Sequence, residues 1–381
     1  MNVLVVTVVH HPEDSRIRAR QIRAMLRAGW RVTYAAPFSG FELPVPEADG
    51  LTAIDLPRAH RRNRLAALRA ARRLLRDRAR DHDLVLLHDP ELLLAVLRLD
   101  RSGLPPVVWD VHEDTAAALT AKPWLPGWAR PAAAAAVRRA ERWADEHVEM
   151  LLAEPSYQAR FARRHAVMPN CVRVPATATA PGDSSVVYIG SLTAARGART
   201  LIKVGQELAA RTGGAVRLRL IGTADLETQP YLRIAEDSGA LTWDGFLPSD
   251  RALAALDGAL AGLCLLRDLP NYRNSMPTKV LEYMANGVPA IVTPLPLARE
   301  LVEAAGCGLV VPFDDAEAVV DAVLRLRDDP DRRRRLGEAG RAVARWQYDW
   351  AVQAPTFLAE LARLSGRVAP QPPEPPDVTS P

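Results

Sequence analysis

The sequence predicts an α/β protein made of two doubly wound domains. Short apolar runs alternate with helical patterns in both halves of the chain, which is typical of parallel sheets covered by helices. Residues 169–185 are rich in Pro, Thr, Ala and Gly and show no periodicity, so they are expected to form a linker. A chain of 381 residues is long enough for one domain on each side of that linker.

The first domain is predicted to span residues 1–168. Apolar runs predict strands at 3–9, 31–36, 51–56, 84–87, 106–109 and 148–152. Helical spacing predicts helices at 15–28, 61–80, 91–99 and 131–144. Strands that alternate with helices in this way pair in parallel, so we expect all of them to end at the same edge of the sheet.

The second domain is predicted to span residues 186–345 and to repeat this alternation. Strands are expected at 186–189, 217–221, 241–243, 261–266 and 309–311, and one more follows Pro289. Helices are expected at 198–211 and 277–286, with further helices to about residue 364. The remaining residues, 365–381, are rich in Pro and are predicted to be disordered.

The composition excludes several classes of protein. The chain has 49 basic and 45 acidic residues, and the net charge of +4 is too small for a dedicated nucleic-acid-binding protein. Three cysteines far apart, without a C-x-x-C pair, indicate neither a zinc knuckle nor a disulfide framework. The first apolar run has no basic leader and is too short to span a membrane. We therefore expect a cytoplasmic protein.

Three predicted strands of the first domain are each followed by a turn that contains histidine. These turns hold His10, His11, Asp14 and Arg16, then His88, Asp89 and Glu91, then His112, Glu113 and Asp114. Because parallel strands end at one edge of a sheet, the three turns are expected to converge on one crevice. A single histidine at a strand end is usually structural, but three together indicate a functional site.

A metal site in this crevice is one alternative. It would make the protein a metal-dependent hydrolase that uses His10, His88 and His112. However, the turns contain no H-x-x-x-H or H-x-x-E-H pair, and the D-x-D segment at 81–83 precedes its strand and so lies at the opposite edge. We therefore expect no metal ion.

In the second domain, residues 271–293 combine a helix N-terminus with two charged side chains. Asn274 or Ser275 is expected to cap the helix. Lys279 lies in its first turn and Glu282 one turn later on the same face.

This order of charges suits a nucleotide diphosphate. A helix N-terminus and an ammonium group attract phosphates, and a carboxylate can accept hydrogen bonds from both ribose hydroxyls. The simpler alternative is a surface helix with an ion pair between Lys279 and Glu282.

The segment S-M-P-T-K-V-L-E-Y-M-A-N-G-V-P-A-I-V at 275–292 is similar to the donor-binding helix of the retaining glycosyltransferases of family 4. The resemblance implies the GT-B fold, with two Rossmann-like domains that face each other across a cleft and a last helix that crosses back to the first domain. W-Q-Y-D-W at 346–350 resembles the start of that helix, expected over 346–364. It also implies metal-independent transfer of a sugar, with retention, from a UDP- or GDP-sugar to an acceptor hydroxyl.

The resemblance assigns roles to single residues of the second domain. Glu282 matches the glutamate that touches the ribose, and Asn274 replaces the one that touches the sugar. In Y-I-G-S-L-T-A-A-R-G at 188–197, Arg196 keeps one of two phosphate-binding cations and Ser191 replaces the other. The remaining donor contacts implied are Gly190, Gly222, Phe246, Ser275, Met276 and Thr278.

H-x-P-x-D-x-R-I, H-D-P-E and D-V-H-E-D in the first domain are similar to a subset of the same family. His112 matches its active-site histidine, which acts beside the transferred sugar. The implied acceptor side consists of His11, Asp14, Arg16, His88, Asp89 and Glu113. We expect the leaving phosphate, stabilised by Lys279 and Arg196, to accept the proton of the acceptor.

The sequence leaves alternatives for the catalytic strength of the protein and for its contact with membranes. The charges missing at Ser191 and Asn274 leave the alternative of a catalytically weak GT-B protein that binds a nucleotide. Residues 58–80 carry ten arginines and one aspartate beside a narrow leucine stripe, so peripheral membrane contact and an ordinary surface helix are both consistent with them. Trp124 and Trp128 are candidates for a second membrane contact or for an acceptor wall.

Overall fold

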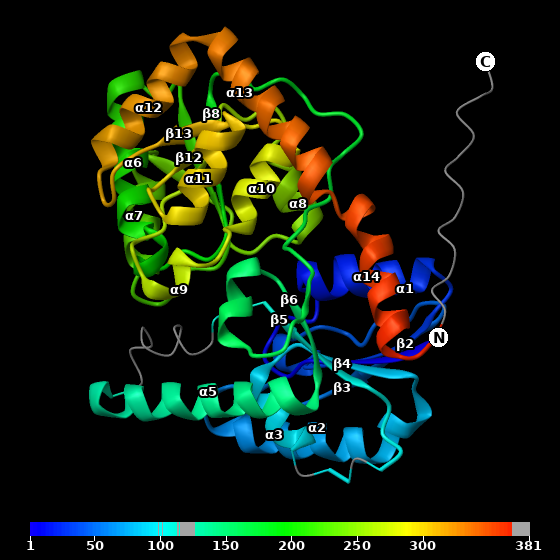
Figure 1. Cartoon of the computed structure of the whole chain (residues 1–381). Helices are drawn as coiled ribbons and strands as arrows, with labels where there is room; N and C mark the ends of the chain where they lie inside the picture. Colours follow the sequence, from blue (N-terminus) through cyan, green and yellow to red (C-terminus); the bar gives the residue numbers. More distant parts are fainter. Residues whose placement is uncertain (98, 101, 113, 115–125, 368–381) are drawn as a thin grey trace, which may run out of the picture. The chain divides into compact units, whose positions relative to one another are not determined.

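The computed structural model describes residues 1–97, 99–100, 102–112, 114 and 126–367 (Figure 1). The chain forms two compact units, each a parallel sheet with helices packed on it. The first unit contains residues 1–169 together with the chain from Val352 onward, and the second contains residues 170–351.

The first unit contains a seven-stranded sheet in the order β3-β2-β1-β4-β5-β6-β7, and every pairing is parallel. Its strands are β1 (Asn2–Val6), β2 (Arg31–Ala36), β3 (Leu51–Asp55), β4 (Leu84–Leu87), β5 (Val107–Val111), β6 (Glu149–Leu152) and β7 (Ala166–Val167). The direction of winding reverses between β1 and β4, and ligands bind at such a switch point in open α/β sheets. The predicted parallel, doubly wound sheet is confirmed.

Helices cover both faces of this sheet. They are α1 (Arg23–Arg27), α2 (Arg64–Arg78), α3 (Leu93–Val96) and α5 (Arg130–His147). Figure 1 shows α2, α3 and α5 on one face, where Leu75, Leu93 and Ala144 pack against the sheet, and α1 on the other.

The helix expected at 15–28 differs from its prediction. It begins as a π-helix over Ser15–Ile22 and becomes α-helical only at α1. Asp14 caps it, because its carboxylate accepts hydrogen bonds from the backbone N–H groups of Arg16 and Ile17.

The second unit contains a six-stranded parallel sheet in the order β10-β9-β8-β11-β12-β13. Its strands are β8 (Ser185–Ile189), β9 (Arg217–Ile221), β10 (Leu241–Trp243), β11 (Ala261–Cys264), β12 (Ala290–Val292) and β13 (Gly308–Val310). The winding reverses between β8 and β11, as it does in the first unit. Residues 170–184 belong to this unit, and Val172 within them exchanges backbone hydrogen bonds with Tyr348 and Trp350.

The helices of the second unit also lie on both faces. They are α6 (Ala198–Thr212), α7 (Gln229–Asp237), α8 (Ser249–Ala254), α9 (Pro270–Arg273), α10 (Thr278–Ala285), α11 (Pro296–Ala305), α12 (Ala316–Asp328) and α13 (Pro330–Val343). One buried cluster joins α6, α7 and α12 to the sheet, and another joins α8, α10 and α11 to its other face.

The last helix, α14 (Trp350–Leu364), leads the chain from the second unit into the first. Phe357 and Leu361 are buried on it. Just after it, Ser365 contacts the Met1 sulfur and Arg367 forms an ion pair with Asp83. Among the described helices, none combines the length and apolar character that crossing a bilayer requires.

Candidate functional site

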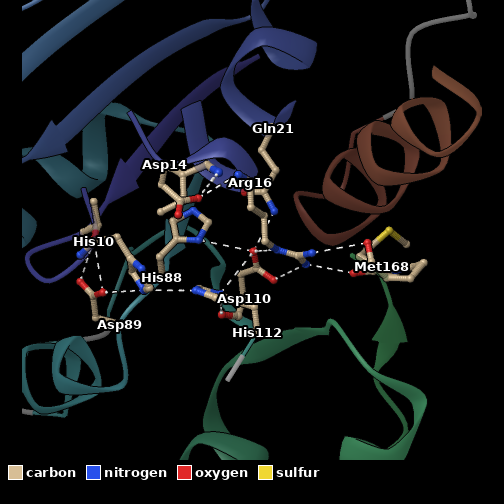
Figure 2. Close-up of polar contacts among 12 residues, drawn as sticks. His10, Asp14, Arg16, Gln21, His88, Asp89, Asp110, His112 and Met168 are labelled. Atoms are coloured by element: carbon tan, nitrogen blue, oxygen red, sulfur yellow. Dashed lines mark hydrogen bonds and ion pairs between the residues drawn. The ribbon is translucent and has the colours of Figure 1, made fainter. Parts of the chain in front are cut away.

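Three histidines of the first unit lie together at the carboxyl ends of neighbouring strands. His10 follows β1, His88 follows β4 and His112 follows β5. The ring centroids of His10 and His112 are 4.7 Å apart, and those of His88 and His112 are 5.9 Å apart (Figure 2). The predicted convergence is therefore confirmed, and its cause is the parallel order β1-β4-β5.

An ion pair between Arg16 and Asp110 lies beneath these rings. Asp110 is fully buried in β5, and both of its oxygens accept hydrogen bonds from Arg16, from Nε and Nη2 at 2.8 Å each (Figure 2). The Gln21 amide donates to the same carboxylate at 2.7 Å. Burial alone would raise the pKa of Asp110, but the Arg16 guanidinium outweighs it and holds that pKa well below its usual range.

A second buried carboxylate, Asp89, lies beside His10. It accepts hydrogen bonds from the Thr7 hydroxyl at 3.0 Å and from the Val8 and Val9 N–H groups, which fixes its position. The Nε2 atom of His10 is 3.2 Å from Asp89 Oδ1 and 3.1 Å from Nε2 of His112 (Figure 2). Asp89, His10 and His112 therefore form one connected polar network.

His112 is a neutral imidazole with a defined tautomer. Its Nδ1 lies 3.0 Å from the carbonyl oxygen of Asp110, which can only accept, so Nδ1 carries the hydrogen. Burial, supported by the neighbouring His10, lowers the pKa of His112. Its Nε2 atom therefore presents a lone pair at physiological pH.

His88, Asp110 and His112 could supply three metal ligands, because their ligand atoms lie within 4.8 Å of one another. His88 Nδ1 lies 3.4 Å from Asp110 Oδ2, and no hydrogen-bond partner of its Nε2 is found among the described residues. However, Arg16 and Gln21 already donate to both oxygens of Asp110. A metal cation there would face a guanidinium at hydrogen-bonding distance from its own ligand, so the group fits a metal ion poorly.

The other predicted acceptor-side residues lie in different surroundings. His11 packs edge-on against Phe41 with 4.6 Å between ring centroids, and its Nδ1 accepts a hydrogen bond from the Glu13 N–H group. Asp14 caps the first helix and Arg16 pairs with Asp110. Glu113 and Trp124 lie outside the described residues.

In the second unit, α10 carries a buried cation in its first turn. Lys279 is only 8% exposed, and its Nζ has no hydrogen-bond partner among the described residues. The ammonium lies 3.7 Å from the centroid of the Tyr188 ring, an attractive cation–π contact. The alternative of a surface ion pair between Lys279 and Glu282 is therefore wrong.

The start of α10 also differs from the prediction. Pro277 precedes the helix, which begins at Thr278, and no side chain caps it. Neither Asn274 nor Ser275 caps α10, because Asn274 ends α9 and residues 275–277 separate it from the first turn of α10. The predicted helix at 277–286 is observed one residue shorter at each end, as Thr278–Ala285, and Gly287 after it has a φ of 70°.

Burial, helped by the charge of Arg196, lowers the pKa of Lys279 from 10.5 to about 7, although Cys264 and Glu282 oppose the shift. Within the part of the chain that the structure describes, no carboxylate pairs with the Lys279 ammonium. Arg196 ends a short 3-10 turn after β8 and has no ion pair in the described part of the chain. Two cationic side chains without anionic partners therefore belong to one site.

Glycines make room next to Lys279. A Cβ atom at Gly190 would lie 3.1 Å from Lys279 Nζ, and one at Gly222 would lie 2.0 Å from the Gly190 carbonyl oxygen. Both glycines have positive φ angles, 133° and 142°, that other residues rarely adopt. The carbonyl of Ser191 accepts a hydrogen bond from the Tyr188 hydroxyl at 2.8 Å, which ties this loop to the ring under Lys279.

The other predicted donor residues surround α10 and the loops after β8 to β10. Asn274 is exposed, whereas Ser275, Met276, Thr278 and Glu282 are half-buried. Phe246, in the turn after β10, is 57% exposed. The loops that carry the predicted donor-site residues thus lie at the same edge of one sheet as the start of α10.

Comparison with known sequences gives matches to part of the chain. Residues 175–343 match the family described as Glycosyl transferases group 1. The GDP-mannose-dependent alpha-(1-6)-phosphatidylinositol monomannoside mannosyltransferase of Mycobacterium tuberculosis is 31% identical over 185 residues, 47% of this chain and 46% of that protein. The putative colanic acid biosynthesis glycosyltransferase WcaL of Salmonella typhimurium is 31% identical over 146 residues, 37% of this chain and 35% of that protein. The chain thus spans less than half the length of these relatives.

Solved structures match nearly the whole chain. Sucrose-phosphate synthase from Thermosynechococcus elongatus has a TM-score of 0.72 at 17% identity and covers 95% of this chain and 98% of its own. WaaG, a glycosyltransferase involved in lipopolysaccharide biosynthesis, has a TM-score of 0.70 at 12% identity and covers 96% and 100%. Anabaena HepE in complex with UDP-glucose has a TM-score of 0.69 at 14% identity and covers 95% and 100%. At such identities the likeness shows the fold, which is GT-B.

Proposed function

We propose that the protein transfers a sugar from a nucleotide diphosphate sugar to an acceptor hydroxyl, because residues 175–343 match the family Glycosyl transferases group 1. The buried ammonium of Lys279 is the observation that carries the proposal. A cation that is removed from water without a counter-ion is costly unless an anion binds to it. The diphosphate of the donor is such an anion, and the glycines beside Lys279 leave room for it.

Two cationic and two polar or acidic side chains of the second unit have proposed roles in the transfer. Lys279 and Arg196 stabilise the charge that develops on the diphosphate as its bond to the anomeric carbon breaks. Glu282 accepts hydrogen bonds from the ribose, and Asn274 orients the sugar. The acceptor oxygen forms the new bond on the same face, and its proton passes to the leaving phosphate, so the anomeric configuration is retained.

The first unit contributes the imidazole of His112 to this reaction. Its neutral state and its Nε2 lone pair suit it to accept a hydrogen bond from a sugar or acceptor hydroxyl. We place no metal in the reaction, because Arg16 already occupies Asp110 and cationic side chains can neutralise the diphosphate.

The donor nucleotide is proposed to be either GDP or UDP. Relatives that match part of the chain are named for GDP-mannose, and neighbours of the same fold were solved with UDP or UDP-glucose. The proposed acceptor is a hydroxyl of a glycan, of a lipid-linked molecule or of a small molecule.

Thermal unfolding with UDP, GDP, UDP-glucose and GDP-mannose, each with and without EDTA, tests this function. One of the nucleotide pairs is expected to raise Tm equally with and without EDTA, since a ligand at a hundredfold excess over Kd stabilises by about 2.7 kcal/mol. Transfer is then followed with the stabilising donor. No shift with any nucleotide would contradict the proposal, and a shift abolished by EDTA would favour a metal-dependent site.

We also propose that the protein contacts the inner face of the membrane through α2, α3 and α5. The exposed side of α2 carries arginines, and only Ala67, Ala71 and Leu75 of this helix are buried. A groove of about 460 Å³ between α3 and α5 is lined by Leu94, Leu97, Arg139, Arg142 and other residues. Leu94 and Leu97 are 49% and 46% exposed. Apolar surface bordered by arginines is typical of contact with anionic lipid.

Vesicle flotation checks this contact. The protein is expected to float with vesicles that contain phosphatidylglycerol and to stay behind with pure phosphatidylcholine. The variant Arg69→Glu/Arg73→Glu should lose flotation, because these two side chains have no ion pair within the described residues. The matched variant Arg332→Glu/Arg335→Glu on α13 of the second unit should keep it. Equal flotation of both variants would contradict the proposed surface.

A further inference from the structure

His10 lies between a carboxylate and the imidazole of His112. Its Nε2 atom is 3.2 Å from Asp89 Oδ1 and 3.1 Å from Nε2 of His112. A carboxylate of this kind only accepts hydrogen bonds, so Nε2 of His10 carries a hydrogen. The Nδ1 hydrogen of His112 is bound to the Asp110 carbonyl, so its Nε2 is the acceptor of the hydrogen from His10.

We propose that His10 is a positioning residue that holds the Nε2 lone pair of His112 ready for a substrate hydroxyl. In the unliganded protein the His10 N–H group fills that lone pair. When a hydroxyl binds, it donates to Nε2 of His112, and the His10 N–H group turns fully to Asp89, which already lies 3.2 Å away. The exchange moves no proton between heavy atoms and leaves no donor unsatisfied.

Asp89 is built to receive this hydrogen bond. Its carboxylate is 1% exposed and is held by the Thr7 hydroxyl and by the Val8 and Val9 N–H groups. A carboxylate fixed by three donors stays in place when His10 changes partner. The Thr7 hydroxyl also accepts a hydrogen bond from the His10 backbone N–H at 3.1 Å, so the turn that carries His10 is tied to the same group.

The charges around His112 affect whether its ring is neutral. His10, Arg16 and His88 oppose a positive charge on its ring, whereas the carboxylates of Asp110 and Asp14 favour one. The Asp110 oxygen nearest to His112 Nδ1 is 3.9 Å away and is already engaged by Arg16 and Gln21. Removing His10 therefore takes away one of the groups that keep His112 neutral.

The inference rests on the proposed function for the identity of the hydroxyl, but its test needs no donor. Imidazole nitrogen–proton correlation spectra of the wild-type protein should show His112 with its hydrogen on Nδ1 at pH 7. In His10→Ala the titration midpoint of His112 is expected to move up toward the ordinary 6.5. His10→Gln, which keeps an N–H donor, should move it less.

His11→Gln is the matched control, because His11 packs against Phe41 and is not among the main causes of the lowered pKa of His112. Its spectrum should show the wild-type midpoint for His112. A hydrogen on Nε2 of wild-type His112, or the same midpoint in His10→Ala and wild type, would overturn the inference. If His10→Ala does not fold, the tautomer of His112 in the wild-type protein and its titration midpoint in His10→Gln still test the inference.

Kinetics separate this role from a structural one and from the proposed function. In His10→Ala the acidic limb of the kcat profile should move to higher pH with His112, whereas a structural defect lowers kcat equally at all pH values. If His10→Ala transfers sugar and the acidic limb of its kcat profile has not moved, the role of His10 is overturned and the proposed function is not. Failure of every nucleotide to bind, with His112 titrating as expected, would overturn the proposed function and leave the coupling of the two imidazoles established.

Discussion

Replacing Lys279 with methionine is expected to lower turnover with the true donor about a hundredfold, or roughly 3 kcal/mol of transition-state stabilisation. The same change is expected to raise Tm at pH 6.5. The Lys279 ammonium is buried and has no hydrogen-bond partner in the described ranges, and a methionine of similar length fills the space without that desolvation cost. Steady-state kinetics and thermal unfolding measure the two effects. A loss of activity with a loss of stability would instead indicate a structural role.

The gain in stability depends on pH with a definite sign. The pKa of Lys279 is about 7 in the folded protein and its ordinary value is 10.5, so the unfolded chain binds more protons between these values. The wild-type protein therefore gains stability from this group as the pH rises from about 7 to 10.5. The advantage of the methionine variant should be full below pH 7 and should disappear toward pH 10.5.

Lys279→Arg is the matched control for donor binding. Only the charged form of Lys279 attracts the diphosphate, so the wild-type affinity for the nucleotide should fall as the pH rises above about 7, by up to tenfold per unit. Arginine stays charged over this range, so calorimetric titrations of the variant at pH 6.5, 7.5 and 8.5 should show less dependence on pH. An equal dependence in both proteins would exclude Lys279 as its source.

The strands were predictable because each is a short apolar run between turn residues. The bounds of β2, β4, β9 and β10 agree with the prediction at both ends. The parallel order of the sheets followed from the alternation of strands with helices, and it placed three histidine turns at one edge. Topology thus determined the location of the candidate site in the first unit.

Helix ends were harder to predict, because side chains with equal capping ability compete. Asn274 and Ser275 are both good capping residues, yet α10 begins after Pro277 and has no side-chain cap. In the first unit, Asp14 does cap its helix, but the π-helical backbone that follows leaves no mark in the spacing of apolar residues.

Partners far apart in the sequence could not be predicted from local patterns. Asp110 reads as one residue of an apolar strand, and its partner Arg16 lies 94 positions away. Arg16 was therefore predicted to lie on the acceptor side, and Asp110 had no predicted role. Tyr188 likewise reads as a residue of β8, and its place under the Lys279 ammonium depends on how α10 packs against the sheet.

Replacing Asp110 with alanine is expected to destabilise the first unit by about 3–5 kcal/mol, because it leaves the buried Arg16 guanidinium without its carboxylate. Urea unfolding measures the loss, and hydrogen exchange of the β5 amides assigns it to this unit. The double variant Arg16→Met/Asp110→Val should lose less than either single change, since an apolar pair leaves no unpaired charge.

The stability lost in Asp110→Ala is expected to depend on pH. The pKa of Asp110 is held well below its ordinary 3.8, so the ion pair contributes its full stability above that value and loses it as the pH falls further. The difference between wild type and Asp110→Ala should therefore be constant from pH 5 to 7 and shrink in stronger acid. A difference that does not shrink, or a double variant as unstable as the singles, would mean that packing around Asp110 and not its charge holds the histidine turns together.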